Sequence, residues 1–183
     1  MSRAAPLPPM LPGYDDFAQR LREKLQGAER VFVLGIGTDW KSDDRVGTVL
    51  ARALARKLGA AARIRVASGG EAPENFTGAV RRFAPSHVVI LDAVDHGLKP
   101  GTAFVAEERQ IAVGDMTSHH LPLKLLMRFL RKSIPCQVVL VGVQPRNLLP
   151  GKRLSAPVRR TVAPLADFLA TAIGEALEEK VQC

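Results

Sequence analysis

The sequence predicts an α/β protein, a three-layer α/β/α sandwich with a five-stranded mixed sheet and one antiparallel edge strand, as in phosphorylase/hydrolase-like folds. Three observations predict it. Short apolar, partly β-branched runs alternate with amphipathic helical stretches. The run His87–Ala93 contains the uninterrupted apolar stretch "VVIL", which is typical of a strand buried on both faces. Only Val94–Pro100 separates it from the next predicted strand, too few residues for a parallel crossover.

The first half of the chain alternates helix and strand signals. Phe17, Leu21 and Leu25 recur every four residues, which places them on one face of a helix. The next apolar run ends on glycines, as a strand entering a turn does. The elements predicted here are a helix over Tyr14–Leu25, a strand over Val31–Ile36, a helix over Arg45–Leu58, a strand over Arg63–Ser68, a short helix over about Glu74–Arg82 and the strand over His87–Ala93.

The second half predicts two further strands and two helices. A strand over Gly101–Glu108 should run antiparallel to the strand before it, or lie elsewhere at a sheet edge. An amphipathic helix over Pro122–Lys132 and a strand over Cys136–Val143 follow. The last helix begins with Ser155 as its predicted N-cap, and Pro164 is a candidate for a kink within it.

Length and composition indicate a single domain. We expect the 183 residues to form one α/β domain over 14–183, preceded by a flexible, proline-rich segment over 1–13. The two cysteines suggest no disulfide framework, so a reducing cytoplasm is expected. No apolar run reaches the length of a membrane span, which predicts no membrane insertion. We also expect a monomer.

The net charge of +8 raises the question of nucleic-acid binding. The basic residues are scattered, mostly over predicted helices, with one mild cluster between Lys152 and Arg160. Only 5% of the residues are aromatic, so a base-stacking surface is poorly supplied. Solvated helix faces explain the charge better, and we expect no nucleic-acid partner. Steep salt dependence of DNA or RNA binding would support the opposite view.

The stretch "VFVLGIGTDWKSDD" combines a glycine turn with carboxylates. A dinucleotide fingerprint needs Gly-x-Gly-x-x-Gly, but Trp40 occupies the place of the third glycine. Carboxylates would also face the pyrophosphate. The sequence therefore argues against a nucleotide turn and favours a site built from acids.

Acidic and imidazole groups follow three of the predicted elements at the edge where open α/β sheets bind ligands. Asp43 and Asp44 come after the first strand, Asp92 ends the third, and His119 and His120 precede a helix. Two carboxylates and an imidazole suit a borderline divalent ion such as nickel or zinc. Simpler explanations remain open: the paired aspartates suit a helix N-terminus, and either histidine suits a cap.

The motifs "GIGTDWKSDDRVG", "SGGEAPENF", "ILDAVDHGLKPG", "TSHHLP" and "VGVQP" resemble, in this order, those of the nickel–iron hydrogenase maturation endopeptidases, especially the hydrogenase-3 type branch. The resemblance implies an enzyme that removes the C-terminal extension of the nickel-loaded [NiFe] hydrogenase large-subunit precursor. It implies that nickel, supplied by the substrate, is the recognition element, although the isolated protein could hold another divalent metal. The matching positions for metal contact and catalysis are Asp44, Asp92 and His119.

The chain departs from that family at one position. Many members have aspartate before the double glycine, whereas Ser68 stands there in this sequence. This keeps open an alternative, a non-cleaving metal- or precursor-binding maturation module on the same scaffold. His120 lies next to the matched histidine, so the register could shift by one residue. Cleavage could proceed by metal activation of the carbonyl or of water, or with Asp44 as general base.

Overall fold

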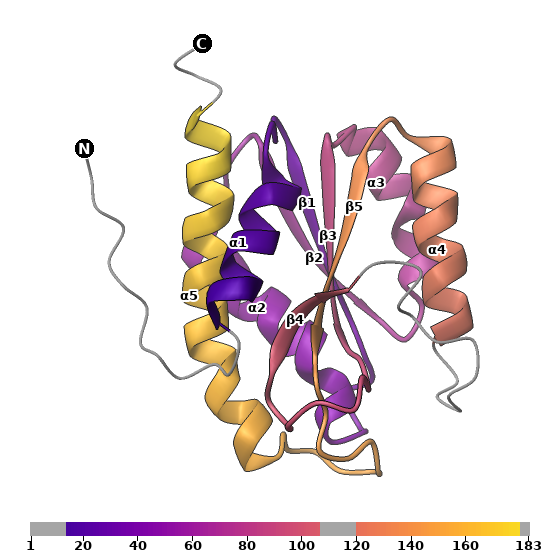
Figure 1. Ribbon diagram of the computed structural model, residues 1–183. Coiled ribbons are helices and arrows are strands. Elements are labelled where there is room, and N and C mark those ends of the chain that lie inside the picture. The colour runs from indigo at the N-terminus through magenta and orange to yellow at the C-terminus, as the bar shows by residue number, and fades with distance from the viewer. Residues whose placement is uncertain (1–13, 107–119, 180–183) are drawn as a thin grey trace.

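The computed structural model describes residues 14–106 and 120–179, and its centre is a five-stranded sheet in the order β2-β1-β3-β5-β4. The first four strands in that order run parallel, and β4 pairs antiparallel with β5 (Figure 1). The strands are β1 (Val31–Ile36), β2 (Ile64–Gly70), β3 (His87–Ala93), β4 (Ala103–Ala106) and β5 (Gln137–Val143).

Helices cover both faces of the sheet, as Figure 1 shows. Helices α1, α2 and α5 lie on one face, and α3 and α4 lie on the other. None of the helices in the described ranges is both long and apolar enough to cross a bilayer. The helices are α1 (Tyr14–Leu25), the 3₁₀ turn η1 (Asp43–Arg45), α2 (Val46–Leu58), the 3₁₀ turn η2 (Pro73–Phe76), α3 (Thr77–Phe83), α4 (His120–Ser133) and α5 (Ala156–Glu178).

The alternation of side chains along each strand divides the core in two. Val89 and Leu91 of β3 pack with α1, α2 and α5, whereas Val88 and Ile90 pack with α3 and α4. All four are fully buried. A strand that is apolar on both faces must be covered on both, so the three-layer sandwich follows from the composition of the central strands.

The predicted fold is confirmed, with one antiparallel strand at the edge of a mixed sheet. Strand β4 lies beside β5 rather than beside β3, since β5 already occupies that side of β3. The predicted kink does not end the last helix, because α5 continues through Pro164. Ser155 precedes α5 as expected, but its hydroxyl makes no capping hydrogen bond and donates instead to Asp43.

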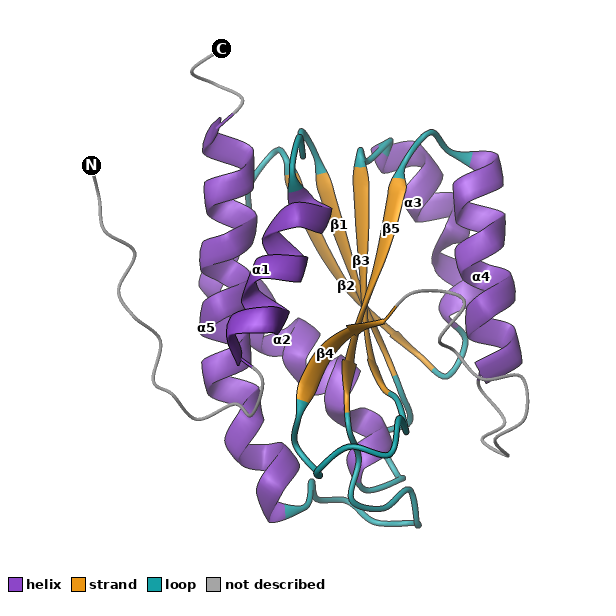
Figure 2. Cartoon of the chain, in the orientation of Figure 1, coloured by secondary structure: helices purple, strands orange, loops and turns teal. Residues whose placement is uncertain are grey.

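The parallel strands end at one edge of the molecule, which we call the carboxyl edge. Gly35 of β1 pairs with Leu91 of β3, and Asp92 pairs with Gly142 of β5, so the three central strands end together. The loops that follow β1, β3 and β5 gather at this edge in Figure 2. Helix α5 also begins there, which brings distant parts of the sequence to one place.

Candidate functional site at the carboxyl edge

Glycines let the loop after β1 press against the strands. Gly37 has φ of 127°, and a Cβ there would collide with the carbonyl oxygen of Asp44. A Cβ on Gly47, in the first turn of α2, would collide with the carbonyl oxygens of Ile36 and Leu91. The Gly-x-Gly motif therefore serves close packing of the aspartate turn on β1 and β3, which agrees with its rejection as a nucleotide fingerprint.

Asp43 is fully buried and fixes the loop between β5 and α5. Its Oδ2 accepts hydrogen bonds from the backbone N–H of Arg146 at 2.8 Å, from that of Asn147 at 3.3 Å and from the Ser155 hydroxyl at 2.8 Å. Its Oδ1 accepts from the backbone N–H of Ser155 at 2.7 Å. With both oxygens engaged in this way, Asp43 acts as an anchor for the loop rather than as an open ligand.

Asp44 and Asp92 are the two predicted site residues that the fold brings together. Asp44 is 6% exposed, and its Oδ2 accepts a hydrogen bond of 2.7 Å from the backbone N–H of Thr38. Asp92 is 5% exposed, and its Oδ1 accepts one of 2.8 Å from the backbone N–H of Ala93. Within the described residues, each of the two carboxyl groups accepts one hydrogen bond, through one of its oxygens. Each therefore keeps an oxygen for a further contact.

Burial and, to a lesser extent, the charge of Asp44 raise the pKa of Asp92 from its ordinary value of 3.8 to about 8, against the opposing effect of the hydrogen bond from the Ala93 N–H. The two acids interact electrostatically because β3, which contains Asp92, packs against η1, which contains Asp44. Two such carboxyl groups in a poorly solvated place form a site that a cation would stabilise, because it would offset their repulsion. This donor chemistry fits a divalent metal ion.

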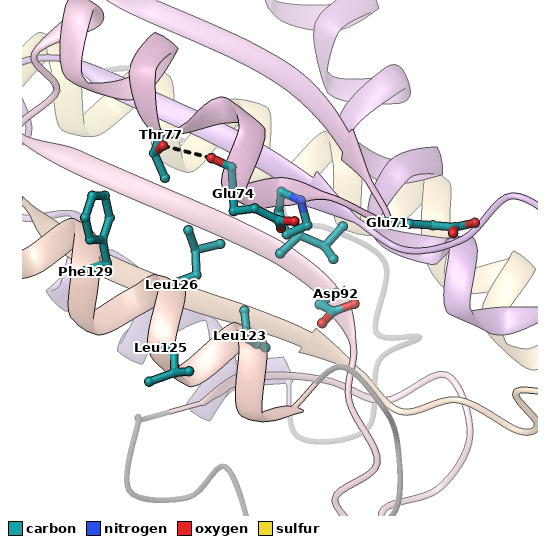
Figure 3. Close-up of a pocket in the computed structure, with 10 residues that line it drawn as sticks. Glu71, Glu74, Thr77, Asp92, Leu123, Leu125, Leu126 and Phe129 are labelled. Carbon is teal, nitrogen blue, oxygen red and sulfur yellow. Dashed lines mark hydrogen bonds between the residues drawn. The ribbon is translucent and has the colours of Figure 1, made fainter.

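Asp92 also lines a pocket of about 590 Å³ between η2, α3 and α4 (Figure 3). Helix α4 forms an apolar wall, along which Leu123 lies nearest to Asp92 and Phe129 lies farthest from it. Glu71 and Glu74 lie on the opposite side. The remaining lining residues are Ile36, Pro73, Thr77, Leu125 and Leu126. The pocket offers an apolar surface that ends at a carboxyl group.

Of the two predicted histidines, one lies within the described residues. His119 lies outside the described residues, and His120 is the first residue of α4. Within 14–106 and 120–179, no three His, Cys, Asp or Glu side chains come close enough to hold a metal ion. The described part of the candidate site is therefore the Asp44–Asp92 pair, and metal contact by Asp44, Asp92 and His119 stays a prediction.

Sequence reasoning missed Gln144, which organises the loop after β3. Its Oε1 accepts hydrogen bonds from the backbone N–H of His96 at 2.8 Å and of Leu98 at 3.1 Å. Its Nε2 donates to Asp95 Oδ1 at 2.9 Å. The signal was present in the motif "VGVQP", since a polar residue directly after a buried apolar strand needs partners. Sequence reasoning also missed that α4 lines a pocket. The helical spacing of its apolar residues is the same as in a helix that only packs on the core.

Ser68 lies on β2, the outermost strand on the side of the sheet opposite to β4. It is exposed on the edge strand β2 and pairs in register with Gly35 of β1. The following Gly69 is buried, and a Cβ there would lie 2.9 Å from Leu34 Cδ1. A side chain at position 69 would therefore require the Leu34 side chain to move.

The fold and these carboxylates define an α/β/α protein with an acidic, pocket-bearing site where such sheets bind ligands. The profile of one family, HycI hydrogenase maturation protease, matches residues 48–172. The chain belongs to this family of hydrogenase maturation endopeptidases. The matched range contains Asp92 and His119 but begins after Asp44.

Individual relatives agree with this assignment. The chain is 36% identical over 116 residues to the hydrogenase 3 maturation protease of Escherichia coli, which covers 62% of this chain and 71% of that protein. The structure is similar to that of the [NiFe] hydrogenase maturation protease HycI from Thermococcus kodakarensis, with a TM-score of 0.77, 26% identity and coverage of 85% and 99% of the two chains. It is also similar to the hydrogenase maturating endopeptidase HybD from E. coli, with a TM-score of 0.70, 25% identity and coverage of 80% and 93%.

Proposed function

We propose that the protein removes the C-terminal extension of a nickel-loaded [NiFe] hydrogenase large-subunit precursor, and that Asp44, Asp92 and His119 contact the nickel carried by that precursor. The observation that carries the proposal is the meeting of Asp44 and Asp92. Asp44 lies in the turn after β1 and Asp92 lies near the end of β3, yet both are buried at one edge, and the charge of Asp44 raises the pKa of Asp92. The family supplies the class of substrate.

The chemistry is hydrolysis, in which water adds across the scissile peptide bond and yields a carboxylate and an amine. The precursor's nickel supplies positive charge that polarises a carbonyl or a water molecule. The protein's part is to hold two carboxyl oxygens ready for that cation and to keep bulk water away from them. Burial of Asp44 and Asp92 and the backbone donors at Thr38 and Ala93 achieve this.

The pocket supports the same proposal, because it places an apolar surface next to the acids. A peptide that enters along α4 passes Phe129 and Leu126 before it reaches Asp92. Burial of one apolar side chain there would contribute about 2 kcal/mol to binding. The extension of the precursor can thus be held beside the carboxyl groups while its nickel is recognised.

The test is incubation of the purified protein with nickel-loaded and with nickel-free precursor, followed by mass spectrometry of the intact subunit. We expect the loaded precursor alone to lose its extension. Asp44→Asn, Asp92→Asn and His119→Ala should each abolish cleavage while circular dichroism stays unchanged. Variant His120→Ala is the matched control, because it removes the neighbouring imidazole but leaves the proposed ligand.

Two results would count against the proposal. Cleavage of the loaded precursor by all three site variants would show that the site is elsewhere. Nickel-dependent binding of the precursor without any loss of mass would favour the alternative, a non-cleaving maturation module. Ser68, which replaces the aspartate found in many family members, is the sequence feature that supports this alternative.

A further inference from the structure

A single antiparallel bridge between two loops flanks the Asp43–Asp44 turn at the carboxyl edge. Lys41 pairs antiparallel with Pro150, and the backbone N–H of Gly151 donates to the carbonyl of Trp40 at 2.8 Å. These residues come from the loop after β1 and the loop after β5. We call the surface formed by residues 40–41, 146 and 149–153 the basic rim.

Hydrogen bonds with buried and half-buried side chains fix the backbone of the basic rim. The Ser42 hydroxyl donates to the carbonyl oxygen of Arg153 at 3.1 Å, and Arg45 Nη1 donates to that of Lys152. Buried Asp43 binds the backbone N–H groups at both ends of the loop, at Arg146 and at Ser155. The backbone is therefore fixed while the side chains above it remain exposed, which is the arrangement of a prepared binding surface.

The basic rim carries unbalanced positive charge. Arg146, Lys152 and Arg153 are exposed, and no ion pair joins them to an acid within the described ranges. Two acids near Trp40 have other partners: Asp39 binds Arg45 and Arg52, and Glu71 accepts a hydrogen bond from the Trp40 indole. In the part of the chain that the structure describes, Arg146, Lys152 and Arg153 are therefore exposed cations without an ion-pair partner.

Two large apolar side chains stand among these cations. Trp40 is 52% exposed and Leu149 is 69% exposed. The ammonium group of Lys41 lies 5.1 Å from the centre of the Trp40 ring. Exposed Trp combined with Arg is the composition of protein interfaces rather than of an ordinary solvated face.

We propose that the basic rim docks an acidic segment of the precursor protein that also presents an apolar side chain to Trp40 and Leu149. The proposal rests on the proposed function, since it names a recognition surface for that substrate. Charge complementarity identifies the partner's chemistry. The surface is continuous with the pocket, because Trp40 Nε1 donates at 2.7 Å to Glu71, which lines the pocket beside Asp92.

The experiment measures precursor cleavage and precursor binding over a range of salt concentrations. Lys152→Glu/Arg153→Glu reverses two exposed charges without touching the carbonyl oxygens that anchor the loop. We expect KM to rise about tenfold at low salt with kcat nearly unchanged, because rim charges act on association. In the wild type KM should rise with salt, and in the variant this dependence should weaken. Lys152→Ala/Arg153→Ala should give an intermediate KM.

The matched control is Arg81→Glu/Arg82→Glu, which makes the same change in net charge on the exposed face of α3. Its KM should change far less than that of Lys152→Glu/Arg153→Glu, since Arg81 and Arg82 lie on α3, outside the basic rim. Equal effects of the two double variants would mean that only net charge matters, and the proposed docking surface would be wrong.

The outcomes separate this inference from the proposed function. If the wild type fails to cleave the precursor, the proposed function fails, and binding of the precursor on a biosensor still tests the rim. Unchanged KM and unchanged binding in Lys152→Glu/Arg153→Glu would overturn the inference while cleavage stands. Rim-dependent binding of plain duplex DNA in place of the precursor would overturn it in favour of a nucleic acid.

Discussion

Replacement of Asp92 by asparagine should make the folded protein more stable at neutral and alkaline pH while it destroys the proposed site. The carboxyl group is buried beside Asp44, and its pKa is raised from 3.8 to about 8. Asparagine keeps an oxygen to accept the Ala93 N–H but has no proton to lose. The substitution removes the free-energy cost of burying an ionisable group beside Asp44.

The sign and the size follow from proton linkage. Between about pH 4 and pH 8 the folded protein holds a proton on Asp92 that the unfolded chain has released, so the free energy of unfolding falls as pH rises. Each pKa unit corresponds to about 1.4 kcal/mol, so the loss has an upper bound of about 5 kcal/mol at pH 8. Asp92→Asn should match the wild type near pH 4 and exceed it progressively up to pH 8.

Guanidinium unfolding at a series of pH values measures this difference directly. Asp39→Asn is a control of opposite sign, because the hydrogen bond from Arg52 lowers the pKa of Asp39, so its removal should slightly reduce stability above pH 4. If Asp92→Asn and the wild type show parallel pH profiles, Asp92 is ionised in the folded protein and the reasoning about the acid pair is refuted.

Three further substitutions test the structure around the site. Asp43→Ala should lower the free energy of unfolding by about 3–5 kcal/mol in chemical denaturation, because it leaves partly buried donors at Arg146, Asn147 and Ser155 without their acceptor. Asp44→Ala removes the hydrogen bond from the Thr38 N–H and should lower it clearly less. Equal losses would contradict the anchor role. Gly47→Ala should cost about 2–4 kcal/mol, since its Cβ would collide with backbone carbonyls of β1 and β3; a Tm within a degree of the wild type would disprove this packing. Phe129→Ala should raise KM for the precursor about tenfold and leave kcat nearly unchanged in steady-state cleavage, and an unchanged KM would exclude the pocket from substrate binding.

The fold was predictable because its signals are local. The buried run of β3 required cover on both faces, and the short link after it excluded a parallel connection to the next strand. The outer limits of elements were less predictable: β4 begins at Ala103 rather than at the predicted Gly101, and the predicted end of this strand lies outside the described residues. Ser155 was predicted as a cap from its position, but the buried Asp43 competes for its hydroxyl.

The site was predictable only in part, since it depends on contacts between distant segments. The position of Asp92 at the end of an apolar strand indicated a special role, and topology then placed Asp44 near it. The hydrogen bonds of Gln144 and the wall formed by Leu123, Leu126 and Phe129 require knowledge of which loops and helices meet. No pattern within a single segment contains that information.

The adjacent aspartates show how the fold separates structure from chemistry. Asp43 points to the loop after β5 and has both oxygens bound, whereas Asp44 points back to Thr38 and keeps an oxygen for another contact. Consecutive residues in a 3₁₀ turn project in different directions, so one turn can lock a loop and present an acid at once. The same anchor fixes the backbone of the basic rim. One buried carboxylate therefore positions both the proposed cation-binding acid and the proposed docking surface, and a defect at Asp43 should impair both together.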